Sequence, residues 1–537
     1  MEANIMTGVK ESLRCVAEMV LPRMLTQVSR DPGSPLHGCW DRNWWHYKIR
    51  DFPSVILQQG GYALWTARAL KPDFAECFSD LSAATARFWN ERARLAGAFE
   101  EYYPYEQGYP PLAFGTLAMA KLCLEGAISK EEIRCGLKVA AGQLATRFEP
   151  RAANQQVAGL AAMAALRKID ATLISQADWE RQVERTLALQ DPEGWYMEYD
   201  GPDIGYLAVT IDCLWDLADL TGEDRFKVSA SKALGFIHRL VAFQKSGIGM
   251  LNSRNTDYLV PYGLTRFLRD GNEEERQQAS RVLDILYANS SSPSHFFAAV
   301  DDRYWCHYIG HSLFRSLEVI KDIPTDQELP EEPATEVFFN RSGYHLQGAE
   351  KIQLIMALRK GGCFTAASGG GRISDFGWIV RQDGKEYVSH WWSNDWEIGV
   401  ESGVSICRGN LFVHKEFTNS PWKHIALRIT SRLAGSRLIG ILKSLLIFKK
   451  PSRTAPSFQR RVSIIAGEIV VEDTLIRLQG DAVVHRAPRG SKRHVASADS
   501  WHSEDACLLS GFTMSEEREA SGGELLIRTT YRVDKEE

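Results

Sequence analysis

The chain has 537 residues, of which 44% are hydrophobic and 24% are charged, and its formal net charge is −5. This is ordinary globular composition at a length that allows more than one domain. The ten cysteines include no CxxC pair and no short-spaced framework, so we expect free thiols in a reducing compartment. Charges interrupt the apolar residues near the N-terminus, which argues against a secretory signal, and no apolar run reaches membrane-spanning length. We therefore expect a cytoplasmic protein.

Apolar residues recur at helical spacing from residue 10 to about residue 325. Loops rich in Gly, Pro and aromatic residues separate many of these segments, so they predict successive helical hairpins. Such hairpins must stack, either as an open solenoid or as a closed toroid, and the spacing leaves both possibilities open. The predicted helices span residues 53–70, 80–96, 111–125, 129–147, 153–168, 176–190, 204–220, 223–243, 256–269, 273–289 and 303–320.

The acidic, Pro-containing segment 321–336 is the predicted linker. After it, apolar and polar residues alternate, and turn signals such as QDGKE at 382–386 separate the alternating runs, as expected of antiparallel hairpins. We therefore predict an α+β multidomain fold. An incomplete (α/α) toroid would occupy residues 1–325, and an antiparallel β-sandwich would occupy residues 326–537.

The stretch 193–222 joins an aromatic, acidic loop to one of the predicted helices. Asp203 can cap the first turn of this helix, and Gly222 supplies its stop. Tyr206 is thus expected at the helix N-terminus, where the positive end of the helix dipole favours a tyrosinate or a bound carboxylate. Loops that deliver polar groups onto a rigid helix often carry chemistry.

Other segments also combine polar groups with aromatic or apolar residues. CWDRNWWHYKIRDFP, residues 39–53, holds too many polar groups for a core helix, so it is either a binding wall or a capping segment whose charges pair locally. Its candidates for substrate binding are Trp45, His46 and Lys48.

Amides open the helix predicted from residue 153. Asn154 can be its N-cap, or the amides of Asn154 and Gln155 can bind a substrate carboxylate without adding net charge. Farther on, LNSRNTDYLVPYG at 251–263 supplies three further candidates for substrate binding, Arg254, Asn255 and Tyr258. Arginine is the natural two-pronged partner of a carboxylate or sulfate.

His307 and His311 share a helical face through their spacing of four residues. Such a pair can bind zinc, but the intervening Glu and a third ligand are missing, so we expect no metal and no cofactor. A structural divalent ion has no supporting motif. His307 is instead a candidate for substrate binding.

In the order and separation of these segments, the chain resembles the heparinase II/III-like polysaccharide lyases and their alginate-lyase relatives. The resemblance covers nearly the whole chain and is most visible at 39–53, 151–166, 198–217, 251–263 and 371–392. It implies an α/α toroid followed by an antiparallel β domain.

The resemblance also implies a chemistry. In the family, an Asn on an inner toroid helix neutralises the uronate carboxylate, and a Tyr roughly fifty residues later is a general acid; Asn154 and Tyr206 match these positions. The implied reaction is β-elimination, with Arg254 supplying the positive potential that a Tyr of ordinary pKa near 10 requires. Many relatives have His where this chain has Gln155, and a His-rich turn where it has GGGRISDFGW. His390 in YVSHWW and His345 in GYHLQG lie nearby in the sequence, so either can replace the missing catalytic His; His390 is the predicted catalytic residue.

We therefore expect a lyase that cleaves a uronate-containing oligosaccharide or polysaccharide. The alternatives are a hydrolase or modifying enzyme of surface polysaccharide synthesis on the same scaffold, and a non-catalytic protein that binds acidic glycans. The segment 417–467 has ten Lys or Arg residues and no acid, so it is either a solvated sheet face or a contact for a polyanion or a membrane surface, the latter through 423–461. Nucleic acid is a poor candidate, because no recognised binding motif accompanies these charges.

Overall fold

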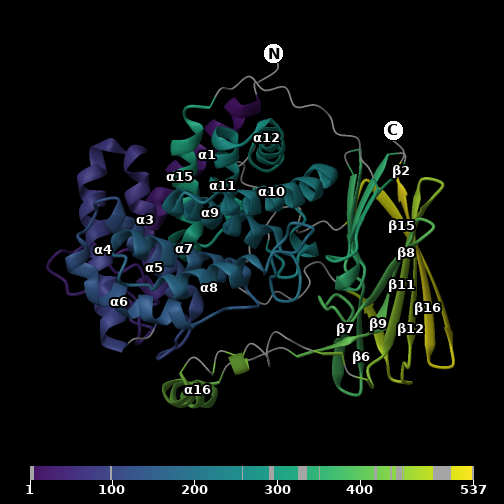
Figure 1. Ribbon diagram of the computed structural model, residues 1–537. Coiled ribbons are helices and arrows are strands. Elements are labelled where there is room, and N and C mark those ends of the chain that lie inside the picture. Colours follow the sequence, from purple (N-terminus) through teal and green to yellow (C-terminus); the bar gives the residue numbers. More distant parts are fainter. Residues whose placement is uncertain are drawn as a thin grey trace.

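The computed structural model describes most of the chain in two parts, one helical and one built of β-sheets (Figure 1). The described residues are 5–96, 99–256, 258–288, 295–323, 336–349, 351–369, 371–415, 420–435, 438, 440–442, 450–451, 453–487 and 509–534. The helical part precedes the sheets along the chain, as predicted. The predicted domain boundary at 325/326 lies outside the described residues.

Six helices form the inner layer of the helical part. They are α3 (Gln59–Thr66), α5 (Tyr109–Leu124), α7 (Ala153–Ile169), α9 (Ile204–Thr221), α11 (Tyr262–Asp270) and α15 (Gly310–Ile320). Each packs against the next, and α15 packs against α3, so the ring closes. The predicted toroid is therefore present, and the solenoid alternative is excluded.

A second set of helices surrounds this ring. It comprises α1 (Ile5–Leu25), α4 (Ala75–Ala96), α6 (Lys130–Thr146), α8 (Gln176–Leu187), α10 (Asp224–Gln244) and α12 (Glu273–Tyr287). Inner helices such as α9 are buried almost throughout, whereas outer helices such as α8 bury only one face. Short helices α2 (Arg42–Trp45), α13 (Phe296–Ala299) and α14 (Asp302–Tyr304) lie in the connections.

Local signals explain where α9 begins and ends. The Asp203 carboxylate accepts a hydrogen bond from the backbone N–H of Tyr206, and Gly222 closes the helix with a positive φ of 74°. Both predictions for this helix are confirmed. By contrast, the helix predicted over 303–320 is interrupted by a π-helical turn, Trp305–Ile309, with non-helical backbone angles at His307. The regular face assumed for His307 and His311 is therefore wrong.

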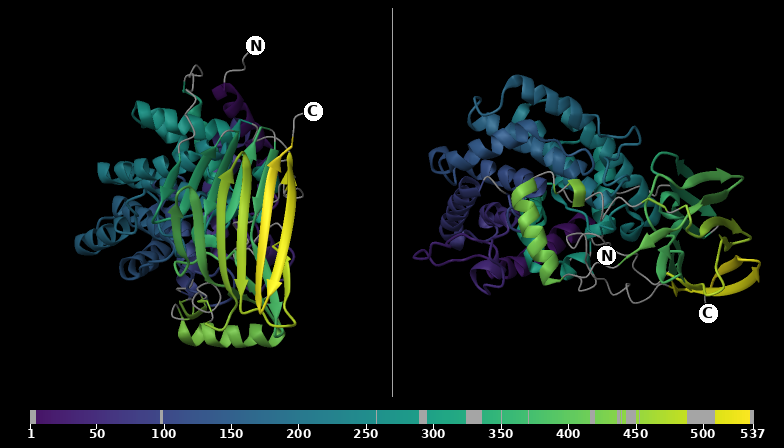
Figure 2. Two further views of the ribbon diagram at one scale, coloured as in Figure 1. Left: turned by 90° about the vertical axis from the view of Figure 1, so that its right-hand side faces the viewer. Right: turned by 90° about the horizontal axis from the view of Figure 1, so that it is seen from below.

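Within its described residues, the second part forms three antiparallel sheets. In spatial order, the first contains β1 (Val337–Phe339), β2 (Tyr344–Ala349), β3 (Ile352–Ala357), β4 (Cys363–Ser368), β5 (Gly371–Asp375) and β14 (Leu509–Ser510). The second contains β10 (Phe412–His414), β7 (Lys385–Val388), β6 (Trp378–Gln382) and β13 (Val483–Arg486). The third contains β15 (Phe512–Ser521), β16 (Glu524–Val533), β12 (Glu468–Ile476), β11 (Ser457–Ile465), β9 (Val404–Asn410) and β8 (Glu397–Glu401). Figure 2 shows the long strands of the third sheet side by side.

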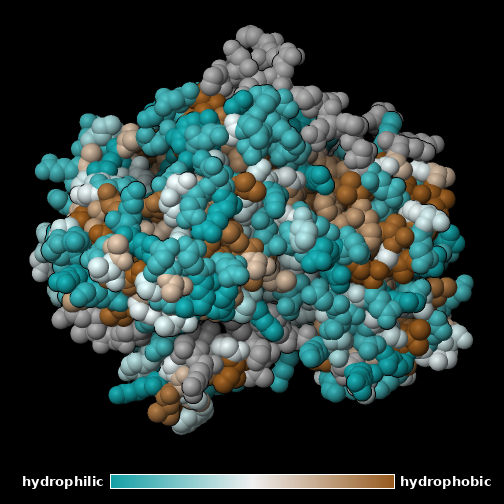
Figure 3. Space-filling model, in the orientation of Figure 1, coloured by the Kyte–Doolittle hydropathy of each residue, from teal (hydrophilic) through white to brown (hydrophobic). Residues whose placement is uncertain are grey.

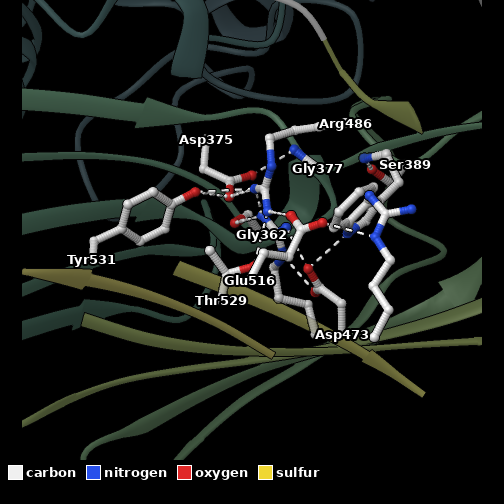
Figure 4. A network of polar contacts seen from close by, with 12 residues as sticks. Gly362, Asp375, Gly377, Ser389, Asp473, Arg486, Glu516, Thr529 and Tyr531 are labelled. Atoms are coloured by element: carbon white, nitrogen blue, oxygen red, sulfur yellow. Dashed lines mark hydrogen bonds and ion pairs between the residues drawn. The ribbon is translucent and has the colours of Figure 1, made fainter. Parts of the chain in front are cut away.

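A buried ionic network joins these sheets (Figure 4). Arg460 on β11 donates two hydrogen bonds of 2.7 Å to Asp473 on β12 and one of 3.0 Å to Asp375 at the end of β5. Asp375 also accepts from Arg486 and from the Tyr531 hydroxyl. Burial acts to raise the pKa of Asp375, but Arg460 and Arg486 lower it to about 2. This aspartate of the GGGRISDFGW segment thus stabilises the sheets.

The two parts meet through the first sheet and the loops beside α10. Lys360, after β3, donates from Nζ to the carbonyl oxygens of Met250 and Asn252 at 2.6 Å each, and to the Asn255 side chain. The Trp392 indole packs on Gly201 and donates to the carbonyl of Asp200 at 3.2 Å. The sheet part therefore braces the loops that lead into the inner helices.

One helix leaves the sheet part and lies against the helical part. It is α16 (Pro421–Ala434), inserted between β10 and β11, and Figures 1 and 2 show it below the toroid. One prediction for the basic segment 417–467 was a solvated sheet face. It is wrong for Pro421–Ala434, because these residues form a helix. Residues 437, 439 and 443–449 of the segment 437–450 lie outside the described residues. Among those described, no helix is long and apolar enough to cross a membrane. The nine cysteines within the described ranges are free thiols.

Candidate functional site

The candidate site is built from loops that enter successive inner helices. Helices alternate between the two layers along the chain, so these loops come together at one end of the ring. Asn154 stands in the first turn of α7, Tyr206 in the first turn of α9, and Arg254 in the loop before α11. Three predicted site residues thus lie on neighbouring elements.

Glu198 connects the start of α7 to the loop before α9. Its carboxylate accepts a 2.6 Å hydrogen bond from the backbone N–H of Asn154, and its carbonyl accepts one of 2.8 Å from the Ser253 hydroxyl. Burial raises the pKa of Glu198 well above its ordinary value, more than the Asn154 hydrogen bond lowers it. Burial therefore favours the protonated form of this carboxyl.

Asp203 connects α9 to the loop before α11. Besides capping Tyr206, its carboxylate accepts backbone hydrogen bonds from Arg254 at 3.2 Å and from Thr256 at 3.3 Å. The side chain of Asn252 reinforces the junction by accepting from Ile204 N–H at 3.1 Å. These bonds fix the position of Arg254 relative to the first turn of α9.

Several buried polar atoms around this junction have no hydrogen-bond partner. They are Asn154 Oδ1, Gln155 Oε1, Glu198 Oε2, and both Nε and Nη2 of Arg254. An unsatisfied buried polar atom costs roughly 1–3 kcal/mol, so native proteins rarely gather several in one place. Arg254 is 1% exposed, and its guanidinium lies over the Tyr199 ring at 4.2 Å from the centroid. Nε and Nη2 form the edge of the guanidinium that binds carboxylates in a two-pronged manner.

Aromatic side chains form the other side of this centre. The hydroxyls of Tyr258 and Tyr308 are 2.9 Å apart. Burial raises the pKa of Tyr308 well above its ordinary value, and both Tyr258 and Tyr206 add to the increase. Burial likewise raises the pKa of Tyr102, to which Tyr206 also contributes. Tyr206 therefore lies close to phenols from the loops before α5 and α15.

His307 lies beside Tyr308 in the π-helical turn. Its ring is edge-on to Tyr304 at 5.2 Å, and its buried Nε2 has no hydrogen-bond partner. Burial, helped by Arg303, lowers the pKa of His307 to about 3. The imidazole is neutral at neutral pH, the form that can accept a proton or a hydrogen bond. Such π-helical turns are frequent at functional sites.

Two buried acids lie in the loop before α5. Burial and the nearby Glu106 raise the pKa of Glu101 to about 8, and burial raises that of Glu106 to about 7. Arg50 donates to the carbonyl of Glu101 at 2.7 Å and to Asp41 at 3.2 Å. Segment 39–53 thus reaches this end of the toroid through Arg50 and Asp41.

The residues predicted from that segment lie elsewhere in it. Trp45 is half-buried and donates from its indole to the carbonyl of Gln27 at 2.8 Å, and His46 and Lys48 are exposed. The structure does not bring these three into the junction of Asn154 and Arg254 through any described contact. Their role in substrate binding stays a prediction.

Asn255 and His390 lie where the two parts of the molecule meet. The Asn255 carbonyl oxygen accepts from Lys360, so this side chain braces the loop. His390 is buried in the loop after β7, whose Trp392 and Asn394 both donate to the carbonyl of Asp200. This loop therefore adjoins the turn that carries Tyr199. The catalytic role of His390 stays a prediction.

Sequence reasoning missed Glu198 and Lys360. Glu198 stands in the stretch 193–222 and could have been noted as an acid beside a predicted helix start, but nothing indicated its burial. Lys360 gave no signal, because its partners lie more than 100 residues away. No three His, Cys, Asp or Glu side chains within the described ranges gather to hold a metal ion.

No protein-family model and no curated protein matches this sequence. Solved structures do match. The Streptomyces coelicolor A3 chondroitin AC lyase in complex with chondroitin sulphate has a TM-score of 0.49 and 9% identity, covering 97% of this chain and 77% of that one. A heparan sulfate lyase HepC mutant from Pedobacter heparinus has a TM-score of 0.25 and 9% identity, with coverage of 88% and 91%. A family 76 glycoside hydrolase from a bovine Bacteroides thetaiotaomicron strain has a TM-score of 0.31 and 12% identity. That match covers 57% of this chain and 76% of the hydrolase.

Proposed function

We propose that this protein is a lyase that cleaves a uronate-containing glycan by β-elimination. The observation that carries the proposal is the set of buried, unpartnered atoms on these neighbouring elements, namely the guanidinium edge of Arg254 and the amide oxygens of Asn154 and Gln155. Tyr199 links two of these residues, because the Arg254 guanidinium lies over its ring and Gln155 donates to its hydroxyl at 3.3 Å. A uronate offers a carboxylate for the guanidinium edge and hydroxyls that donate to amide oxygens. Because these groups are buried, a chain end fits them better than the middle of a long polymer.

Each of these residues has a separate role in the elimination. Arg254 and the side-chain NH2 group of Asn154 donate to the carboxylate of the uronate, which stabilises the negative charge that develops when the adjacent ring carbon loses its proton. A base takes that proton, the electron pair forms a carbon–carbon double bond, and the glycosidic carbon–oxygen bond breaks. Tyr206 gives its proton to the departing oxygen. His390 is the predicted base, and the neutral imidazole of His307 lies at the same end of the toroid.

The test is the ultraviolet absorbance of the conjugated double bond, with alginate, glycosaminoglycans and bacterial uronate polymers offered as substrates. We expect a rise with the wild-type protein and none with Tyr206→Phe. Tyr196→Phe is the matched control, because Tyr196 is also buried but its hydroxyl is 2.7 Å from Ser229, outside the junction. A fully active Tyr206→Phe enzyme would refute the assignment of the proton donor.

Glycoside hydrolysis is the second candidate, and Glu198 favours it. A buried carboxyl with a raised pKa and an unpartnered Oε2 is suited to act as a general acid. Product mass separates the two reactions, since elimination leaves the total mass unchanged and hydrolysis adds one water. Glu198→Gln would abolish hydrolysis. If the reaction is elimination, the variant would keep its proton donor, Tyr206, and therefore its activity.

A further inference from the structure

Helix α16 is held against the end of the toroid that carries the candidate site. Arg428 forms an ion pair with Asp51, with Nη2 3.0 Å from Oδ1. The Ser431 hydroxyl donates to the carbonyl of Pro104 at 2.8 Å, and the Arg432 guanidinium lies 5.5 Å from the Tyr105 ring centroid. These contacts reach the loops before α3 and α5.

The opposite side of α16 is an exposed apolar stripe. Trp422, Ile425, Ile429 and Leu433 are 79%, 47%, 57% and 82% exposed. At 3.6 residues per turn, these positions fall on one face, roughly opposite the buried Ser431. Figure 3 shows hydrophobic residues on the projection at its lower edge, where Figure 1 places α16. A tryptophan and three aliphatic side chains facing solvent on a 14-residue helix require a partner surface.

The charge of the segment that contains the stripe indicates that partner. From residue 417 to residue 467 the chain has ten Lys or Arg and no Asp or Glu, while the whole chain has a net charge of −5. Of these ten, Arg460 belongs to the buried network of the sheets and Arg428 pairs with Asp51, while Lys423 is exposed beside the stripe. A glycan would use the cations but not bare Ile and Leu side chains, and a second copy of this acidic protein would not need an apolar stripe in a segment without acids.

We propose that α16 is an interfacial helix that docks the protein on an anionic lipid surface. The apolar stripe enters the boundary between headgroups and acyl chains, Trp422 lies at the interface, and the exposed Lys423 beside the stripe contacts the lipid phosphates. Because α16 is fixed to the loops before α3 and α5, docking turns the candidate site toward the lipid surface. The inference does not depend on the proposed lyase reaction.

Vesicle co-sedimentation of the full chain tests the proposal. We expect binding to vesicles of phosphatidylcholine with phosphatidylglycerol, little binding to phosphatidylcholine alone, and weaker binding as salt rises. Trp422→Ser/Leu433→Ser should weaken binding to the anionic vesicles at least about tenfold, because it removes the most exposed apolar groups of the stripe. Phe74→Ser/Val228→Ser is the matched control, because Phe74 and Val228 are 56% and 55% exposed but lie outside α16.

Each contrary outcome overturns the proposal. Wild-type protein that stays in the supernatant, or a double variant of α16 that binds as tightly as wild type, would exclude lipid docking through this helix. A wild-type dimer that the α16 variant dissociates would assign the stripe to a second copy. Salt-sensitive retention on alginate without vesicle binding would assign the cations to a glycan. Thermal unfolding of both double variants should match wild type, since all four side chains are exposed.

Discussion

Lys360→Met tests whether the sheet part positions the candidate site. Lys360 is 2% exposed and places one ammonium group on three acceptors of the loop that carries Arg254. Methionine keeps a similar length but donates no hydrogen bond, so all three acceptors lose the ammonium group, and the Asn252 carbonyl keeps only the 3.4 Å bond from the backbone N–H of Asn255. Each orphaned acceptor costs roughly 1–3 kcal/mol, and relief from burying the ammonium charge offsets part of the sum. We expect the net stability to fall by about 2–5 kcal/mol, mostly through easier local opening of residues 250–256.

Hydrogen exchange measured by mass spectrometry is the direct assay. Peptides covering 250–256 should lose protection in Lys360→Met, while peptides from inner helix α7 keep it. Lys351→Met, at an exposed position in the turn at the other end of β3, is the control and should exchange like wild type. Unchanged protection of 250–256 would show that this loop holds its position without the sheets, and the reasoning would be refuted.

Three further predictions concern stability and pH. Arg460→Met should destabilise the sheets by about 3–5 kcal/mol in urea unfolding, because it leaves two buried carboxylates facing each other; wild-type stability would contradict the network of Figure 4. The pKa of His307 is about 3 in the folded protein and 6.5 in its ordinary state. Between these pH values the unfolded chain binds one more proton than the folded protein, so the free energy of unfolding falls as pH drops from 6.5 toward 3. His307→Gln should reduce that slope by up to about 1.4 kcal/mol per pH unit, and an unchanged slope would count against it. The raised pKa of Glu198 has the opposite consequence. Above the ordinary pKa of 4.5 the unfolded carboxyl ionises while the folded one keeps its proton, so the free energy of unfolding falls as pH rises. The gain in stability of Glu198→Gln over wild type should therefore be larger at pH about 8 than at pH about 5.

The helices and hairpins followed from local chemistry. The Asp203 cap and the Gly222 stop bound α9 within one residue of the prediction, because both signals act within a few residues. The π-helical turn at Trp305–Ile309 was missed, because a local change in hydrogen bonding leaves the apolar spacing almost unaltered. Helix α16 was missed for another reason. Its apolar residues face solvent, so its pattern matched no expectation of a buried core.

The candidate site was predictable where one loop or helix start carries the signal. Asn154, Tyr206 and Arg254 were found in this way, and the structure brings their elements together through Glu198 and Asp203. What holds them together was not predictable, because it depends on burial and on contacts between distant segments. Asp203 accepts one backbone N–H group from α9 and two from the loop before α11, but in the sequence it looks like any helix cap.

The closed ring explains why residues so far apart in sequence share one site. Inner helices begin at Gln59, Tyr109, Ala153, Ile204, Tyr262 and Gly310, which are 50, 44, 51, 58 and 48 residues apart. One outer helix stands between each successive pair, so every loop that enters an inner helix returns to the same end of the ring. Polar residues placed just before these starts therefore converge, whatever their sequence separation. The same geometry accounts for the position of α16, since its contacts with Asp51 and Pro104 fall on two of these entering loops.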